Sequence, residues 1–278
     1  MQTTSNISPD SLFPINTKPL KIVVFDLDET LGYFVQLGMF WDAVKNYTKQ
    51  SLNQTDFDNM LDLYPEFIRP NILSILKFLK VKKKNNKCSH LMIYTNNQGP
   101  PEWAMMIKTY FETKMDAVIF DRIIAAFKIN GKQVEFCRTT HNKTHNDFIK
   151  CSKVPKNSQI CFLDDVYHPD MKNDNVYYIN IKPYVYDLSF QDMCVRYIKK
   201  GYVSLHVQES FTRSILHYVE RYSHIYVPKK QDEYEVDTIL TKHILHHIQI
   251  FFNNDVGSKN TTTRRSKKIN NFTMKCRR

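Results

Sequence analysis

The sequence predicts an α/β protein whose central parallel sheet is covered by helices on both faces. Between residues 20 and 185, short apolar segments alternate with amphipathic segments of helical period, which is the pattern of such sheets. Three of the apolar segments run into polar side chains, namely Asp26, Thr95 and Asp164. Because ligands of parallel sheets bind beyond the carboxyl ends of the strands, the pattern also predicts a functional site at that edge.

Short, continuous apolar runs identify the buried strands. The predicted strands are LKIVVFDL (20–27), HLMIYTNN (90–97), QICFLDD (159–165) and NVYYINI (175–181). Asn130 and Gly131 suit a tight turn between DAVIFDRIIAAF and KQVEFC, which predicts a small β-hairpin insertion.

Proline and capping residues mark where the predicted helices begin. Pro70 opens a helix in RPNILSILKFLK, and the two prolines of PPEWAMMIKTYFETKM open another. In HNKTHNDFIKC, Thr144 and Asp147 have the spacing of a helix cap and its return partner. Strand and helix therefore alternate throughout the predicted core at residues 20–185.

The regions outside this core have a different character. Residues 186–253 contain three successive amphipathic segments, and we expect these extra C-terminal helices to pack onto the core. Residues 1–19 form an N-terminal extension, and residues 254–278 form a basic tail that we expect to be disordered. From residue 255 onward the tail has eight basic side chains and one acid, so it holds +7 of the formal net charge of +11. The tail is either a solvated segment that aids solubility, or a segment that binds nucleic acid or another polyanion or directs the protein to the nucleus.

The six cysteines are scattered, without a Cys-x-x-Cys pair. This spacing favours reduced thiols over a disulfide framework or a zinc cluster, and it predicts an intracellular protein of the cytoplasm or nucleus. The N-terminus lacks the basic start and apolar stretch of a signal peptide, and the apolar cluster ILHHIQIFF is too short for a membrane span, so no membrane partner is expected. Six glycines alongside many Asn, Lys and Ile indicate an AT-rich coding sequence, which is typical of a parasite or a large DNA virus.

Asp26 and Asp28 lie two residues apart where the first strand ends, and side chains two apart on a strand share a face. Such paired carboxylates suit the hydrolysis of a phosphate monoester. Asp26 would attack phosphorus to form an aspartyl phosphate, while Asp28 would protonate the leaving alcohol and later deprotonate water. Because a negative nucleophile needs a cation to approach a phosphate dianion, Mg²⁺ is the expected cofactor.

Four motifs occur in a fixed order: Asp-x-Asp-x-Thr after an apolar strand, a threonine ending a later strand, a lysine before an amphipathic segment, and a strand ending in Asp-Asp. Together they resemble the haloacid dehalogenase (HAD) superfamily of phosphotransferases. DLDETL, the RP helix, YTNN and FLDD are most similar to RNA polymerase II carboxy-terminal-domain (CTD) phosphatases and NLI-interacting-factor-like phosphatases. The resemblance covers about residues 20–185. It implies a HAD-like Rossmannoid three-layer sandwich.

The resemblance also implies a role for each motif residue. The expected metal ligands are Asp26, Asp164, the backbone carbonyl of Asp28 and, through water, Asp165. Thr95 and its neighbour Asn96 are expected to bind substrate, with Thr95 donating a hydrogen bond to a phosphoryl oxygen while a lysine neutralises another.

Three lysines, Lys143, Lys150 and Lys153, lie between Thr95 and Asp164. Lys143 stands immediately before the predicted helix, whereas Lys150 lies at its far end. A lysine at the start of that helix matches the placement in the family. We therefore choose Lys143 as the catalytic, phosphate-binding lysine, with Lys150 as the alternative.

The segments between the motifs are too short for a large cap domain, since 65 positions separate Thr30 from Thr95. An open site favours a phosphorylated protein as partner, so the expected function is a serine/threonine protein phosphatase of the CTD type. The enzyme alternatives are a nucleic-acid 3′-phosphatase that uses the tail, and a small-molecule phosphatase with Phe40 and Trp41 in a helical lid. A different class is a non-catalytic HAD-fold interaction protein whose helical region and tail bind partners. The acids could also merely end strands and form turns.

Overall fold

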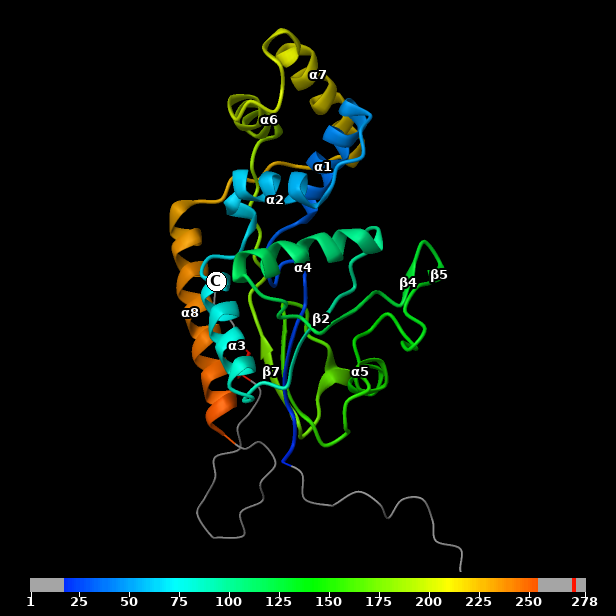
Figure 1. Cartoon of the computed structure of the whole chain (residues 1–278), viewed down its shortest axis with the longest axis vertical. Coiled ribbons are helices and arrows are strands. Elements are labelled where there is room, and N and C mark those ends of the chain that lie inside the picture. The colour runs from blue at the N-terminus through cyan, green and yellow to red at the C-terminus, as the bar shows by residue number, and fades with distance from the viewer. Residues whose placement is uncertain (1–17, 255–271, 274–278) are drawn as a thin grey trace, which may run out of the picture.

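The computed structural model describes residues 18–254 and 272–273 (Figure 1). Its centre is a parallel sheet with the strand order β3-β2-β1-β6-β7-β8. Five of these strands form the sheet of the α/β core, and the two-residue β8 pairs with the β7 edge. The six strands of the sheet are β1 (Lys21–Phe25), β2 (His90–Tyr94), β3 (Arg122–Ile124), β6 (Gln159–Asp164), β7 (Val176–Asn180) and β8 (Phe272–Thr273).

The four predicted strands are confirmed as β1, β2, β6 and β7. The predicted hairpin is also present, formed by β4 (Lys128–Ile129) and β5 (Lys132–Gln133) with Asn130 and Gly131 in the turn at positive φ. It is shorter than expected, because residues 122–124 pair with β2 as β3 rather than with the hairpin. The N-terminal extension up to residue 17 lies outside the described residues, as does the expected disordered tail apart from residues 254 and 272–273.

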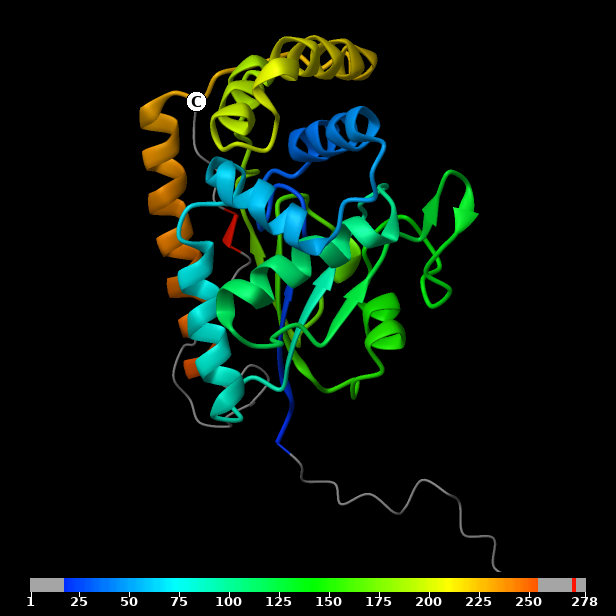
Figure 2. The ribbon, with the colours of Figure 1, turned by 45° about the horizontal axis from the view of Figure 1, so that its top comes forward.

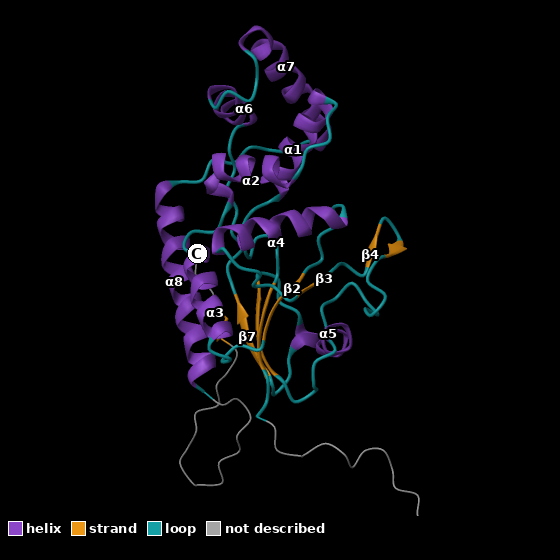
Figure 3. Cartoon of the chain, viewed as in Figure 1, coloured by secondary structure: helices purple, strands orange, loops and turns teal. Residues whose placement is uncertain are grey.

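Helices cover both faces of the sheet, as the α/β pattern predicted (Figure 3). No helix in residues 18–254 has the length and apolar character needed to cross a bilayer. The helices are α1 (Val35–Thr48), α2 (Gln54–Leu63), α3 (Ile72–Lys84), α4 (Pro101–Met115), α5 (His145–Ser152), α6 (Phe190–Lys199), α7 (Gln208–Val219) and α8 (Gln231–Asn253), with short 3₁₀ turns at Pro65–Phe67, Pro169–Met171, Leu205–Val207 and Glu220–Tyr222.

Successive side chains of β1 point alternately into two hydrophobic cores. Val23 and Phe25 belong to a large core that includes side chains of α3, α4 and α8, whereas Ile22 and Val24 belong to a smaller core with α5. Because successive side chains of a strand point to opposite faces, these two cores lie on opposite faces of the sheet. The second face is the one that carries the site described below.

Helices from two distant parts of the chain meet beyond one end of the sheet (Figure 2). We call α1, α2, α6 and α7 the helical lobe. Tyr47 of α1 packs edge-on against Phe211 of α7, and Tyr197 of α6 stacks on the same Phe211 ring. Phe40 and Trp41, which the sequence offered as lid residues for a small ligand, are instead buried in this packing at 0% and 3% exposure. The lobe therefore uses its aromatic residues to hold itself together.

One cysteine pair contradicts the expectation of reduced thiols. Cys137 and Cys151 form a disulfide, and their Cα atoms are 5.1 Å apart. The chain between them turns back through α5, which brings together two cysteines whose spacing of 14 residues carries no recognisable signature. Cys88, Cys161 and Cys194 are free and buried.

Candidate active site

Asp26 and Asp164 come together because β1 and β6 are neighbouring parallel strands. The Asp26 N–H donates to the Leu163 carbonyl at 2.9 Å, which continues the ladder one residue beyond the end of β1. Val24 and Phe162, two residues earlier on each strand, both face the core under α5. The two acids therefore emerge on that same face, and both are buried.

Lys143 lies between these two carboxylates. Its Nζ donates to Asp26 Oδ1 at 2.5 Å and to Asp164 Oδ2 at 2.6 Å, and its side chain is 2% exposed. The ammonium also lies over the rings of Tyr94 and Phe162. Burial alone would lower the pKa of Lys143, but attraction by Asp26 and Asp164 outweighs it and raises the pKa above its ordinary value. The lysine is therefore a buried, permanent cation at neutral pH.

The start of α5 determines which lysine reaches the acids. The Thr144 hydroxyl accepts a hydrogen bond from the Asp147 N–H at 3.0 Å, so Thr144 caps the helix as the sequence indicated. Lys143 precedes this cap, on the sheet face that α5 covers. Lys150 and Lys153 lie at the other end of α5, exposed, so the structure places Lys143 rather than either of them at the acids.

Asp165 completes a group of three carboxylates. Ligand oxygens of Asp26, Asp164 and Asp165 lie within 4.8 Å of one another, and Thr30 Oγ1 donates to Asp165 Oδ1 at 3.2 Å. Burial, followed by repulsion from Asp26 and Glu29, raises the pKa of Asp165 to about 6. A single ammonium leaves this group with an excess of negative charge, and its donors are all oxygen atoms. These properties fit a hard divalent cation such as Mg²⁺.

Asp28 is positioned by a loop and not by the strand, because β1 ends at Phe25. The pleat argument used on the sequence therefore does not account for where its carboxylate lies. Asn97 Nδ2 donates to Asp28 Oδ2 at 2.7 Å, whereas the buried Oδ1 has no hydrogen-bond partner among the described residues. Burial is the main reason that the pKa of Asp28 is raised to about 7, and the charges of Asp26 and Glu29 add to it. A carboxyl group with this pKa can both give and take a proton near neutrality.

Thr95 and Asn96 follow the end of β2, as predicted. Thr95 is 2% exposed, and its Oγ1 accepts a hydrogen bond from the Asn97 N–H at 3.0 Å. This contact leaves the hydroxyl hydrogen available for a further acceptor. Asn96 is half-buried, and its backbone carbonyl accepts from Gln98 Nε2 at 3.0 Å. Asn97, which the sequence analysis did not select, is the residue whose side chain reaches Asp28.

Two buried arginines hold the loops that carry the site. Arg69 donates to the Glu29 and Thr30 carbonyls at 2.5 and 2.7 Å, and so fixes the loop after β1, in which Glu29 has a φ of 56°. Arg138 donates to the Thr95 carbonyl at 3.1 Å and also to carbonyls of the segment before Lys143. The sequence showed Arg69 only as part of the RP pair, and nothing in the sequence singled out Arg138.

His168 is a further neighbour that the sequence did not reveal. Its Nε2 lies 3.6 Å from Asp164 Oδ2, and its side chain is buried. Burial, reinforced by repulsion from Lys143 and Arg138, lowers the pKa of His168 to about 4. It is therefore neutral at physiological pH and adds no positive charge to the site.

No protein-family model matches the chain, and no curated protein matches it. The fold is a mixed α/β arrangement of the Rossmann-like kind, with a parallel sheet flanked by helices. The candidate site lies at the carboxyl ends of β1, β2 and β6, where ligands of such sheets bind. Any functional assignment therefore depends on the chemistry of these side chains.

Proposed function

We propose that the protein is a Mg²⁺-dependent phosphomonoester hydrolase of the HAD type that works through a phosphorylated Asp26. The observation that carries this proposal is the contact of Lys143 with both Asp26 and Asp164, beside an Asp28 whose pKa is raised to about 7. A nucleophile, a fixed positive charge and a proton-exchanging group thus lie within one small site. Carboxylates that merely end strands would not require a buried cation or a desolvated acid beside them.

Each residue has a defined task in this reaction. An Asp26 oxygen attacks phosphorus, while Lys143 and the Thr95 hydroxyl bind phosphoryl oxygens and stabilise the charge that develops there. Asp28 donates its proton to the leaving alkoxide. It then takes a proton from the water that attacks the aspartyl phosphate, which regenerates both carboxyl groups.

The acidic excess at the site supports the need for a metal. Mg²⁺ held by Asp26, Asp164 and Asp165 would supply the positive charge that lets a phosphate dianion approach the Asp26 carboxylate. Without it, Lys143 is the only cation that the described residues place in direct contact with the Asp26 carboxylate. Thr30 and the backbone N–H of Val166 orient Asp165 and Asp164 for this role.

We infer that the substrate is a phosphoserine or phosphothreonine in a protein, as in the CTD phosphatases that the sequence resembles. The burial of Phe40 and Trp41 in the helical lobe supports this over a small-molecule phosphatase, because these aromatic residues are not available to enclose a small ligand. The tail that would favour a nucleic-acid substrate lies mostly outside the described residues. The buried free thiols support an intracellular location, whereas the disulfide does not.

Release of phosphate from para-nitrophenyl phosphate and from a phosphoserine peptide, with Mg²⁺ or with chelator, tests the proposal. We expect turnover by the wild type with Mg²⁺ only, and its loss in Asp26→Asn. Asp174→Asn is the matched control, because Asp174 is an exposed acid in the loop before β7. Equal turnover by wild type and Asp26→Asn would contradict the mechanism. Turnover of a 3′-phosphorylated oligonucleotide in preference to the peptide would instead indicate the nucleic-acid enzyme.

A further inference from the structure

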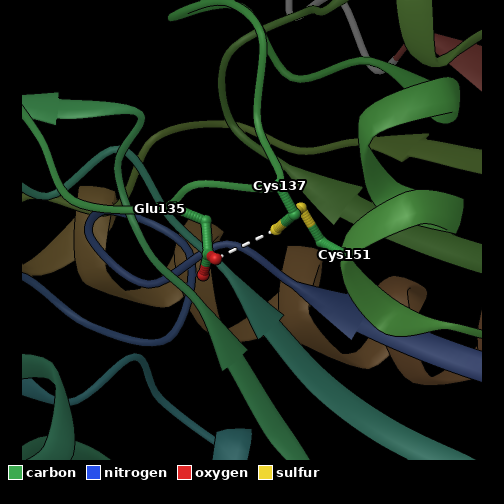
Figure 4. A group of neighbouring side chains, drawn as sticks. All are labelled: Glu135, Cys137 and Cys151. Carbon is green, nitrogen blue, oxygen red and sulfur yellow. Dashed lines mark hydrogen bonds between the residues drawn. A yellow bond between two sulfur atoms is a disulfide. The ribbon is translucent and has the colours of Figure 1, made fainter.

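The disulfide encloses the lysine of the candidate site. We call residues 137–151 the lysine loop, since Lys143 lies within the ring that the Cys137–Cys151 bond closes. Cys137 is at the start of the loop, next to Arg138, and Cys151 is in the last turn of α5. Figure 4 shows the bond together with Glu135, whose carboxylate points toward Cys137.

We propose that Cys137 is a site of reversible thiol–disulfide exchange with low-molecular-weight thiols, and that its bond to Cys151 sets how firmly the lysine loop is held. The loop has no strand pairing within it. Apart from the disulfide, it is tied to the rest of the protein by Arg138, which donates to the Thr95 carbonyl, by Lys143, which donates to Asp26 and Asp164, and by the buried Phe148. Reduction removes one of these attachments, so the loop opens more often.

Exposure selects the sulfur that is attacked. Cys137 is partly exposed, whereas Cys151 is 0% exposed on the buried face of α5. A thiolate therefore attacks Cys137 Sγ, the bond between the two cysteines breaks, and Cys151 leaves as a thiolate that takes up a proton. A second thiol attacks the resulting mixed disulfide and releases Cys137 as a thiol. The net change is two-electron reduction of the protein disulfide by two thiols, which leave as their own disulfide.

Glu135 controls the rate of this exchange. Its Oε1 lies 2.9 Å from Cys137 Sγ. A disulfide sulfur has no proton to donate, so this approach becomes a hydrogen bond only after reduction. In the oxidised protein the carboxylate repels an incoming thiolate. In the reduced protein the same carboxylate accepts from the thiol and holds it in the protonated form, which is not nucleophilic. Glu135 therefore slows both reduction and reoxidation.

Glu135 therefore makes the change between the oxidised and the reduced state of this cysteine pair slow in both directions. The same residue is fixed from the other side, because its Oε2 accepts from the Ala125 N–H at 3.4 Å and its Oε1 lies 3.9 Å from Arg122. If the proposed function holds, a loosened lysine loop also weakens phosphoryl binding, and this consequence rests on that function. The thiol–disulfide exchange and the loosening of the loop do not depend on the proposed function.

The first test uses full-length wild type and no assay of phosphatase activity. Peptide mapping without reductant should recover Cys137 linked to Cys151, and mapping after treatment with reduced glutathione should not. Acylation of Lys143 by a water-soluble active ester, followed by mass spectrometry, then reports how often the loop opens. We expect roughly tenfold faster acylation in the reduced protein, below the ceiling of about 100-fold that closing a loop of this size allows.

Variants separate the disulfide from general destabilisation. Cys137→Ser should show the fast acylation without reductant, whereas Cys88→Ser removes a buried free thiol and should match the oxidised wild type. Glu135→Gln should accelerate reduction by glutathione severalfold, and should also accelerate reoxidation. Absence of the linked peptide, or equal acylation of Lys143 in the two redox states, would overturn the proposal. If the wild type showed no Mg²⁺-dependent turnover, but Lys143 was still acylated faster in the reduced protein, only the proposed function would be overturned.

Discussion

Two regions supply opposite charges to the candidate site, and they hold them in different ways. Asp26 and Asp164 emerge from β1 and β6, whose positions are fixed by backbone hydrogen bonds of a parallel ladder. Lys143 comes from the lysine loop, which is held by side-chain hydrogen bonds, a helix cap and a disulfide. Backbone ladders survive most substitutions, whereas each attachment of the loop depends on one replaceable side chain. The position of the cation should therefore be the more easily altered half of the site.

Removing the cation itself should have the largest effect. Lys143→Met leaves Asp26 and Asp164 buried side by side without a counter-charge, so we expect a loss of about 3–5 kcal/mol in the free energy of unfolding at neutral pH in chelator. Turnover should fall by about 100-fold or more, because a fixed charge on the phosphoryl group is lost. Denaturant unfolding and steady-state kinetics measure the two quantities.

Lys150→Met is the control for this substitution, since Lys150 is exposed at the far end of α5. It should leave stability and turnover close to those of the wild type. If Lys150→Met lost turnover as severely as Lys143→Met, the assignment of the phosphate-binding lysine would be wrong.

Arg138→Leu should break the connection between the two regions. It removes the guanidinium that joins the Thr95 carbonyl at the end of β2 to the His141 and Asn142 carbonyls of the lysine loop. We expect a loss of about 2–4 kcal/mol in unfolding free energy, because several buried carbonyls lose their donor. Thermal or urea unfolding would detect it. Arg122→Leu, which removes only a half-exposed guanidinium 3.9 Å from Glu135, should cost much less.

The charge of Asp28 lowers the free energy of unfolding, and the raised pKa of this carboxyl shows at which pH it does so. The pKa of Asp28 is about 7 in the folded protein against an ordinary value of 3.8, so the folded state binds the proton more tightly. Its charged form therefore destabilises the fold, increasingly as pH rises from 4 to 7 and fully above pH 7. Asp28→Asn should raise the unfolding free energy at pH 8 by about 1–3 kcal/mol in chelator, with no gain near pH 4. An equal effect at both pH values would show that the carboxyl titrates normally.

The smallest effect should come from the cap of α5. Thr144→Ala removes the acceptor for the Asp147 N–H directly after Lys143, at a cost of about 1 kcal/mol. Ser189→Ala removes the corresponding cap of α6 in the helical lobe, where the Ser189 hydroxyl accepts from the Asp192 N–H at 3.0 Å and also donates to Asp192 Oδ2 at 2.7 Å. The two variants should lose similar stability, but only Thr144→Ala should also lower kcat/KM, by a fewfold. Equal kinetics in the two variants would show that the cap does not position the lysine.

The sequence predicts well those parts of the site that follow from local pattern. Asp26 and Asp164 are recognisable because each ends an apolar strand, and Lys143 is recognisable because Thr144 and Asp147 mark the start of a helix. Asp28 was selected because strand geometry would place it beside Asp26, but β1 ends before it and the loop held by Arg69 positions it.

Contacts between distant segments could not be predicted in this way. Arg138 reaches back 43 residues to Thr95, and Asn97 reaches Asp28 across 69 residues. Cys137 and Cys151 meet because the loop after Cys137 leads into α5, which carries Cys151 back beside it. Each of these contacts depends on how the strands and loops are placed in three dimensions. Hydrophobic periodicity and turn residues carry no information about that placement.

The helical lobe has a consequence for synthesis of the chain. Its first helix, α1, ends at Thr48, whereas its main partner, α7, does not begin until Gln208. At the usual speed of translation, about 10–30 s pass between the emergence of the two helices from the ribosome. During that interval the Tyr47 ring lacks the Phe211 ring against which it packs in the finished protein. The Tyr47 ring therefore gains its final packing partner only after most of the chain has been made.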